Sequence, residues 1–107
     1  MSNATEPDWG ASPASLSPAA YDYLRRHLGF DGAILTDALE AGAVRSAGFD
    51  GAQAAVQAIE AGADMAMLTD PSDYDPAVAG LEAAVASGRL TRTRLERSVG
   101  RILALKV

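Results

Sequence analysis

The segment that decides the fold is Gly32-Ala33-Ile34-Leu35-Thr36-Asp37-Ala38-Leu39-Glu40. Its apolar run, Ala33 to Leu35, has no polar alternation, which is typical of a strand buried on both faces in a parallel sheet. The run ends in Thr36-Asp37, and a carboxylate at the carboxyl end of such a strand lies where α/β barrels and open α/β sheets carry their chemistry. Asp37 is therefore a candidate catalytic residue, although the local sequence by itself favours the simpler role of capping the next turn.

A second segment repeats this pattern thirty residues later. The sequence Ala63-Asp64-Met65-Ala66-Met67-Leu68-Thr69-Asp70 predicts a strand over 65–68 that again ends in Thr-Asp. The segments before, between and after the two strands have apolar residues at helical spacing. This spacing predicts helices from Ser17-Pro18 to Gly29, over 50–61 with Asp50 as N-cap, from Pro76 to Ala86, and from about Thr93 into the carboxyl end.

The order helix, strand, helix, strand, helix, helix predicts an α/β fold with two parallel strands and four helices, built from right-handed βαβ units. Two strands do not form a stable sheet alone. We therefore expect either that copies of the chain associate through their unpaired strands, giving a homo-oligomer, or that the chain is part of a larger barrel.

Composition narrows the function classes. The 107 residues are 49% hydrophobic and 21% charged, which is typical of a globular domain. The net charge of −5 argues against a nucleic-acid partner. The sequence contains no cysteine, so a thiolate metal site is excluded. No apolar run has the length of a membrane span and no secretion signal is visible, which leaves localisation open.

The first residues carry a different signal. Ser2-Asn3-Ala4 is typical of the remnant of a cleaved expression tag, and residues up to about 16 are rich in Ser, Pro, Gly and Ala. We assign residues 1–12 to a tag remnant and irregular lead-in, and residues 13–107 to the folded βα units.

From Pro13 onward the sequence resembles glycoside hydrolase family 3, and most closely its β-N-acetylhexosaminidase branch. Each matching piece is short, but their order and spacing are specific. The pieces are Pro13-Ala14-Ser15-Leu16-Ser17, Leu24-Arg25, Leu28-Gly29-Phe30-Asp31-Gly32, Thr36-Asp37-Ala38-Leu39-Glu40, Ala61-Gly62-Ala63-Asp64-Met65, Ala84-Val85, Gly88, Arg94-Leu95, Ser98-Val99 and Arg101-Ile102-Leu103.

The resemblance implies that residues 13–107 are the C-terminal part of a TIM (β/α)₈ barrel and that Asp37 is the catalytic nucleophile. It implies retaining hydrolysis of a terminal β-linked N-acetylhexosaminide, with a carbohydrate substrate and no metal or organic cofactor. Thr36 is expected to orient Asp37, and Asp70 to have a structural or substrate-rim role.

The sequence departs from the family at several positions. Ala38 stands where the family often has a second Asp, and Ala41 where a Met is frequent. The general acid/base of this branch comes from a His–Asp dyad on an earlier loop, which these residues do not contain; His27, the only histidine, is not in that context. We therefore expect the isolated chain to be inactive.

Two other interpretations remain. The chain could be a non-catalytic α/β module that self-associates through exposed sheet edges. It could also belong to another barrel family that binds phosphate at its last strand ends, although Pro71 and Pro76 remove two amides from the loop in question.

Overall fold

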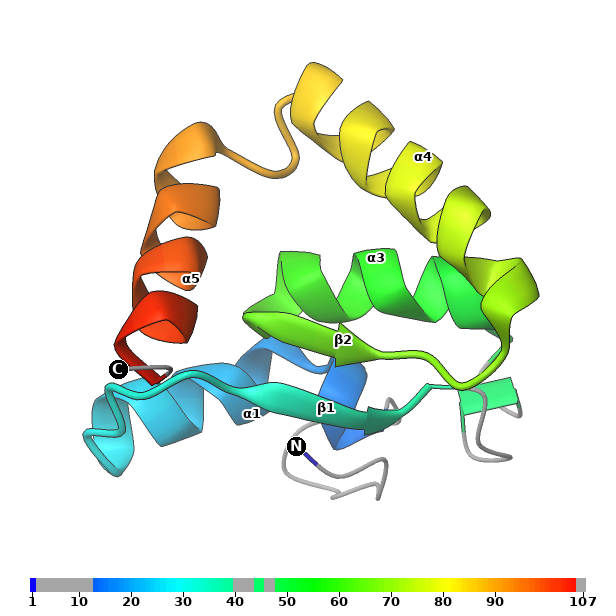
Figure 1. Ribbon diagram of the computed structural model, residues 1–107. Helices are drawn as coiled ribbons and strands as arrows, with labels where there is room; N and C mark the ends of the chain where they lie inside the picture. Colours follow the sequence, from blue (N-terminus) through cyan, green and yellow to red (C-terminus); the bar gives the residue numbers. More distant parts are fainter. Residues whose placement is uncertain (2–12, 40–43, 46–47, 106–107) are drawn as a thin grey trace.

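The computed structural model describes residues 1, 13–39, 44–45 and 48–105. These residues form an α/β fold with four α-helices and a sheet of two parallel strands, as the sequence predicts (Figure 1). The segment assigned to a tag remnant lies, apart from Met1, outside the described residues. In chain order the elements are the short 3₁₀ turn η2 (Ala14–Leu16), α1 (Pro18–Asp22), the π-helical turn η3 (Tyr23–His27), β1 (Leu35–Ala38), α3 (Gly51–Ala61), β2 (Met65–Met67), the short 3₁₀ turn η4 (Pro71–Asp73), α4 (Tyr74–Ala86) and α5 (Arg92–Leu105).

The first helix begins as predicted but does not stay regular. Ser17 caps α1 by accepting a hydrogen bond from the Ala20 amide, and Pro18 occupies the first helical position, where its missing amide costs nothing. The last turn widens into η3, in which the Leu28 amide donates to the Tyr23 carbonyl five residues earlier. The single helix predicted over this segment is thus an α-helix followed by a π-turn.

The two strands pair in parallel, with Leu35 opposite Met65 and Ala38 opposite Met67. β1 lies two residues further along the chain than the strand expected over 33–36, so Asp37 is inside the strand. The prediction that these strands are buried on both faces is wrong for this chain. Leu35, Met65 and Met67 are 43%, 36% and 39% exposed, because helices cover only the other face of the sheet.

Helix α3 packs on that covered face. Asp50 and Gln53 form a capping box, in which each side chain accepts from the other residue's amide at 2.8 and 3.1 Å. Gly62 ends the helix with φ +142°, and a Cβ there would lie 2.8 Å from the Cβ of Tyr21, so only glycine fits. The buried core around α3 includes Leu16, Tyr21, Ile34, Leu39, Val44, Ala54, Ala55, Ala58, Ile59 and Leu90.

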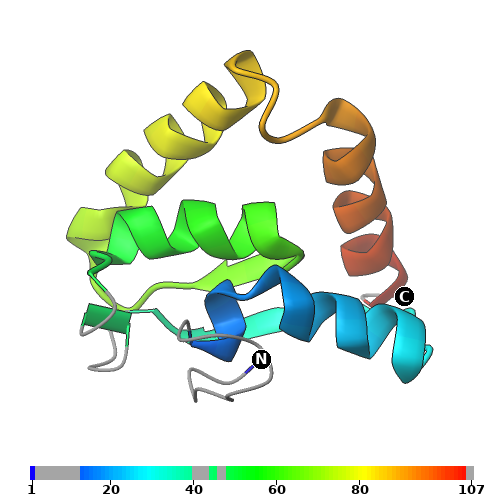
Figure 2. The same ribbon diagram turned by 180° about the vertical axis from the view of Figure 1, so that it is seen from behind.

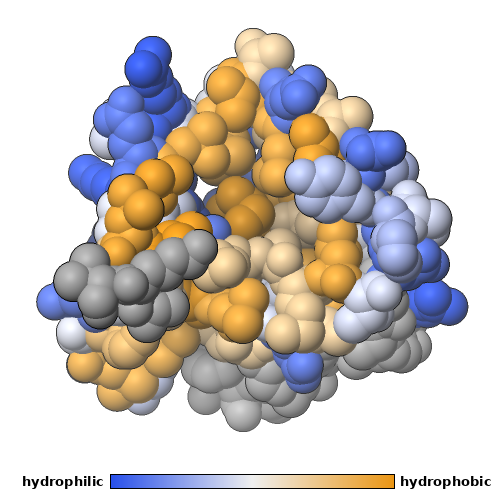
Figure 3. All heavy atoms as spheres, viewed as in Figure 1, coloured by the Kyte–Doolittle hydropathy of each residue, from blue (hydrophilic) through white to orange (hydrophobic). Residues whose placement is uncertain are grey.

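The last two helices diverge. Helix α4 packs along α3, whereas α5 stands away from both, and the two views of Figures 1 and 2 agree on this separation. Apolar side chains line the hollow between α4 and α5, a cavity of about 480 Å³, and Figure 3 shows them as an orange band. No helix in the described part of the chain combines the length and apolarity required to traverse a bilayer.

Candidate functional site

Asp37 is the third of the four residues of β1 and is exposed. Its Oδ1 accepts a hydrogen bond of 2.9 Å from the Ala38 amide, the next amide along the strand. Among the described residues no donor reaches Oδ2. The side chain therefore presents one free carboxylate oxygen to solvent near the carboxyl end of β1, inside the strand, whereas the sequence placed it just after the strand.

Thr36 does not orient Asp37. Its side chain is buried, and Oγ1 accepts a hydrogen bond of 2.9 Å from the Met67 amide of the neighbouring strand. Successive side chains of a strand point to opposite faces, so the hydroxyl and the carboxylate lie on different sides of the sheet. Thr36 ties β1 to β2 at the place where the pairing is irregular.

Asp70 has the structural role that the sequence allowed for it. It is the N-cap of η4, and its Oδ1 accepts from the Ser72 amide at 3.0 Å and from the Ser72 hydroxyl at 2.8 Å. It also lines a cavity of about 470 Å³ together with Arg45, Asp50 and Asp73. Among the described residues no group of three or more His, Asp or Glu side chains is arranged to hold a metal ion.

The outer edge of β1 is in contact with the first residue of the chain. The Asp37 amide donates to the Met1 carbonyl at 2.7 Å, and the Met1 amino group donates to the Leu35 carbonyl. The Ser15 hydroxyl also donates to the Met1 carbonyl, at 2.8 Å. Backbone groups that a neighbouring strand would pair are therefore occupied on this side of Asp37.

His27 ends η3, before the turn that leads into β1. It is exposed, and its ring lies 5.2 Å from that of Tyr23, centroid to centroid. Because it precedes β1 while Asp37 lies near the end of that strand, the structure does not bring the histidine and the carboxylate together.

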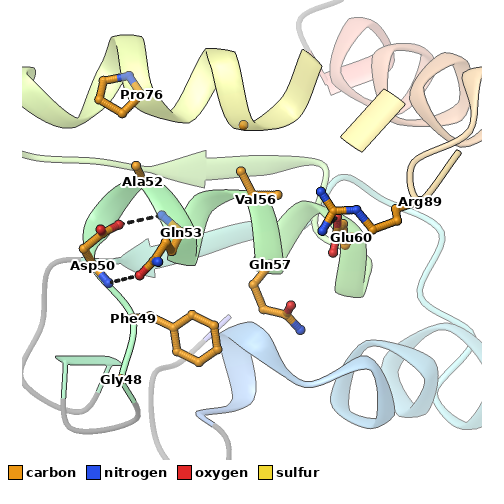
Figure 4. A pocket seen from close by; sticks show the side chains of 11 residues that line it. Gly48, Phe49, Asp50, Ala52, Gln53, Val56, Gln57, Glu60, Pro76 and Arg89 are labelled. Carbon is orange, nitrogen blue, oxygen red and sulfur yellow. Dashed lines mark hydrogen bonds and ion pairs between the residues drawn. The ribbon is translucent and has the colours of Figure 1, made fainter. Parts of the chain in front are cut away.

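A groove between α3 and α4 is a second concave surface, with a volume of about 510 Å³ (Figure 4). Glu60 and Arg89 face each other across one end of it, with Glu60 Oε1 and Arg89 Nη1 3.6 Å apart. Asp50 and Gln53 form the capping box at the other end. Asp37 does not line this groove, so its polar residues are not part of the same site.

The sequence did not lead us to predict a buried electrostatic cluster around Asp64. The Asp64 side chain is completely buried immediately before β2 and pairs with three arginines, at 2.8 Å to Arg25, 3.1 Å to Arg101 and 3.8 Å to Arg94. Its carboxylate also accepts from the Ser98 hydroxyl at 2.6 Å and from the Ile34 amide at 2.9 Å. We name these six residues the Asp64 cluster.

Burial shifts the pKa values of two groups of this cluster, Asp64 and Arg94, in different balance with their neighbours. Burial by itself raises the pKa of a carboxyl group, yet the hydrogen bonds from Ser98, Ile34 and Arg101 outweigh it and hold the pKa of Asp64 below its ordinary value. Burial also lowers the pKa of Arg94, against the opposing attraction of Asp64. Next to the cluster, burial raises the pKa of Tyr21, whose hydroxyl donates to the Ser15 carbonyl at 2.7 Å.

The family of the chain follows from comparison with known proteins. The model of the glycosyl hydrolase family 3 N terminal domain matches residues 1–105. The curated Beta-hexosaminidase LpqI of Mycobacterium tuberculosis is 34% identical over 102 residues, which are 91% of this chain and 26% of that protein. The chain thus spans about a quarter of the length of the curated relatives it matches.

Solved structures agree with this result. A family 3 β-N-acetylglucosaminidase from Paenibacillus sp. str. FPU-7 is 45% identical with a TM-score of 0.79, over 89% of this chain and 18% of that one. CbsA from Thermotoga neapolitana is 29% identical with a TM-score of 0.86, over 98% of this chain and 24% of that one. These structures confirm the predicted barrel-type α/β fold class. This chain belongs to glycosyl hydrolase family 3.

Proposed function

We propose that this chain supplies the nucleophile, Asp37, of a retaining glycoside hydrolase that acts on terminal β-linked N-acetylhexosaminides. The observation that supports the proposal is the exposed carboxylate near the carboxyl end of β1 in a family 3 chain. The substrate class rests on the names of the relatives, a β-hexosaminidase and a β-N-acetylglucosaminidase.

The chemistry needs a carboxylate that is fixed yet accessible. The Ala38 amide holds Oδ1 of Asp37, which leaves Oδ2 to attack the anomeric carbon. A proton donor on the opposite side of the glycosidic bond protonates the leaving oxygen, and a covalent glycosyl–enzyme ester forms. Water, deprotonated by the same group, then hydrolyses the ester with overall retention of configuration.

We further propose that residues 13–107 are the C-terminal βα units of a longer barrel, in which the acid/base lies outside these residues. The chain spans only about a quarter of its curated relatives. A (β/α)₈ barrel needs eight strands, whereas the described residues form two, with apolar side chains exposed on one face of the sheet. We expect the isolated chain to release no para-nitrophenol from para-nitrophenyl N-acetyl-β-glucosaminide.

The gene tests the second part of this proposal directly. A reading frame that continues upstream and encodes further βα units with a His–Asp loop supports it. Turnover by the isolated chain that is abolished in Asp37→Ala would instead show that these residues are sufficient, and it would overturn the assignment to a larger barrel.

The role of Asp37 is tested by a matched pair of variants in the complete translation product. We expect Asp37→Asn to lower kcat by at least about 10³-fold, because asparagine is not a nucleophile at the anomeric carbon. Asp70→Asn is the control, since Asp70 also follows a threonine after a strand and asparagine still caps η4. Equal losses in both variants would contradict the assignment.

Azide rescue separates the nucleophile from an acid/base residue. In Asp37→Ala, azide enters the space left by the carboxylate and attacks once, so the glycosyl azide should have the α configuration. Loss of an acid/base leaves the double displacement intact and gives the β azide. Isolation of the β azide from Asp37→Ala would show that Asp37 has the other role.

The second candidate function is a self-associating module without catalysis. It is favoured by the exposed Leu35, Met65 and Met67 on the open face of the sheet. Light scattering after size exclusion distinguishes it from the first, since a folded monomer at micromolar concentration would exclude assembly through these strands.

A further inference from the structure

A cavity of about 500 Å³ lies between the first helical segment and α5, beside the carboxyl end of α3. In both Figures 1 and 2 the carboxyl-terminal half of α5 lies beside the segment that contains η3. Four arginines line the cavity, and Asp22 is the one carboxylate among its lining residues. These arginines are Arg25, Arg94, Arg97 and Arg101.

The positive charge around this cavity exceeds the negative charge. The buried Asp64 carboxylate faces three arginines, so it neutralises one of three charges. Asp22 is already paired with Arg26, which lies outside the lining, at 2.8 Å. The cavity therefore keeps a cationic surplus in a chain whose overall charge is −5.

Two of the four arginines, Arg97 and Arg101, have N–H donors that no described residue accepts. The terminal nitrogens of Arg25 and Arg94 donate hydrogen bonds to Asp64, to Ser98 and to backbone carbonyls. Arg101 Nη1 donates to Asp64 at 3.1 Å, and within the described ranges no acceptor lies within hydrogen-bond distance of its Nη2 or Nε. The same holds for the guanidinium of the exposed Arg97 among the described residues.

The spacing on α5 concentrates these donors. Arg94, Arg97 and Arg101 follow one another at intervals of three and four residues, so they share one face of the helix. Like charges at these spacings repel each other, and an anion between them would relieve the repulsion. Planar guanidinium groups are also the preferred partners of phosphate oxygens, because two parallel N–H donors match two oxygens.

We propose that this cavity binds a small phosphate dianion, either free phosphate or the phosphate of a small phosphomonoester, through Arg97 and Arg101. A compact ligand fits the charge distribution, since the net charge of −5 would repel an extended polyanion while the local surplus attracts a small one. The site is remote from the candidate nucleophile, because Asp64 precedes β2 whereas Asp37 lies near the end of β1. It therefore does not depend on the proposed glycosidase activity.

The test is a titration of the full chain with inorganic phosphate, followed by ¹H–¹⁵N NMR at constant ionic strength maintained with sodium chloride. We expect saturable shifts of the Arg97 and Arg101 side-chain Nε–H signals and of the Gly100 amide. Arg97→Ala should raise the dissociation constant about tenfold, as expected for loss of one charge-assisted contact. This variant leaves the contacts of Asp64 intact, so it should fold.

The matched control is Arg92→Ala on the same helix. Arg92 is exposed, pairs with Glu96 at 3.0 Å and does not line the cavity, so its removal should leave the phosphate affinity within about twofold. A parallel titration with glycerol phosphate distinguishes the ligand sources: equal affinity indicates free phosphate, and tighter binding indicates a phosphomonoester. Absence of saturation, shifts that chloride reproduces, or equal weakening in both variants would overturn the proposal.

Discussion

A single carboxylate, Asp64, connects parts of the chain that are far apart in sequence. Its oxygens are bonded to η3 through Arg25, to the segment before β1 through the Ile34 amide, and to α5 through Ser98 and Arg101. Bringing a charge out of water is costly, and it is tolerated here because every contact is charged or hydrogen-bonded. The arginines stay 19% to 27% exposed, which keeps part of their hydration.

We expect Asp64→Asn to lower the free energy of unfolding by about 2–3 kcal/mol at neutral pH, because three arginines lose their common counter-charge. The pKa of Asp64 is lowered in the folded state, so the unfolded chain takes up the proton first and the contribution is lost as the pH falls below about 4. Urea unfolding over a pH series should therefore show the difference between wild type and variant shrinking in acid.

The control for this series is Asp31→Asn, a change at an exposed aspartate that should alter stability by less than about 0.5 kcal/mol. A difference between wild type and Asp64→Asn that stays constant from neutral to acidic pH would show that the carboxylate is not the origin of the effect.

At the scale of elements, α3 and α4 pack closely against each other. Gly80 of α4 lies over Val56 of α3, and a Cβ on Gly80 would be 2.7 Å from Cγ2 of Val56. Valine is stiff about χ1 and cannot turn this methyl group away cheaply. The glycine is therefore a packing requirement, in contrast with Gly100 of α5, where a Cβ would meet nothing within 4 Å.

The two glycines should respond to alanine with opposite sign. We expect Gly100→Ala to stabilise the chain by about 0.5–1 kcal/mol, through helix propensity. Gly80→Ala should destabilise it by about 1–2 kcal/mol, because overpacking outweighs the same gain in propensity. Thermal unfolding of both variants measures the difference.

The double variant Gly80→Ala/Val56→Ala removes the clashing methyl and should recover part of the loss. If Gly80→Ala proved as stabilising as Gly100→Ala, α4 would not approach α3 as closely as described.

Features of the fold that depend on neighbouring residues could be predicted from the sequence, whereas features that depend on residues far apart in the chain could not. Helix α3 was predictable because its signals are local: Asp50 is the N-cap, apolar residues recur at helical spacing over Gly51–Ala61, and Gly62 ends the helix. The π-turn in Tyr23–His27 was not, because Arg25 of that turn bonds to Asp64 thirty-nine residues away. The sequence does contain signals for the Asp64 cluster, namely an acidic residue directly before an apolar strand and arginines spaced along α5. No local pattern, however, shows that the acidic residue and the arginines meet.

In the candidate site, too, some features were predictable from the sequence and others were not. Asp37 was predicted, from a strand end and a family resemblance, to follow the strand. It is the third of the four residues of β1, and its catalytic role stays a proposal. Thr36 was expected to orient the carboxylate and instead accepts a hydrogen bond from the Met67 amide. The apolar run placed the strand two residues too early and ended it at Thr36. Because β1 continues through Asp37, the two adjacent side chains point to opposite faces of the sheet.

At the scale of the whole molecule, the sheet is covered on one face and its two edges differ. Met1 occupies backbone groups on the outer edge of β1. The Met65 and Met67 amides point toward β1, so the Ala66 amide points to the other edge of β2. If copies of the chain pair through their strands, β2 is the edge that the described residues leave for it.

The self-association hypothesis therefore makes a specific prediction for Ala66→Pro. Proline removes the outward amide of β2 without removing a bond to β1, so it should convert a dimer to a monomer at micromolar concentration. Light scattering measures the mass, and circular dichroism confirms that the fold is kept. A dimer of unchanged affinity in Ala66→Pro would exclude pairing through this edge.

The Asp64 cluster has a consequence for the order in which the chain assembles. The carboxylate is synthesised thirty residues before Arg94, and the earlier segments offer it Arg25 as their only guanidinium partner in the cluster. Burying it at that stage would leave the charge with few donors, so we expect β2 to dock stably onto β1 only once α5 has been synthesised. A nascent polypeptide cut short before α5 should therefore keep Asp64 hydrated.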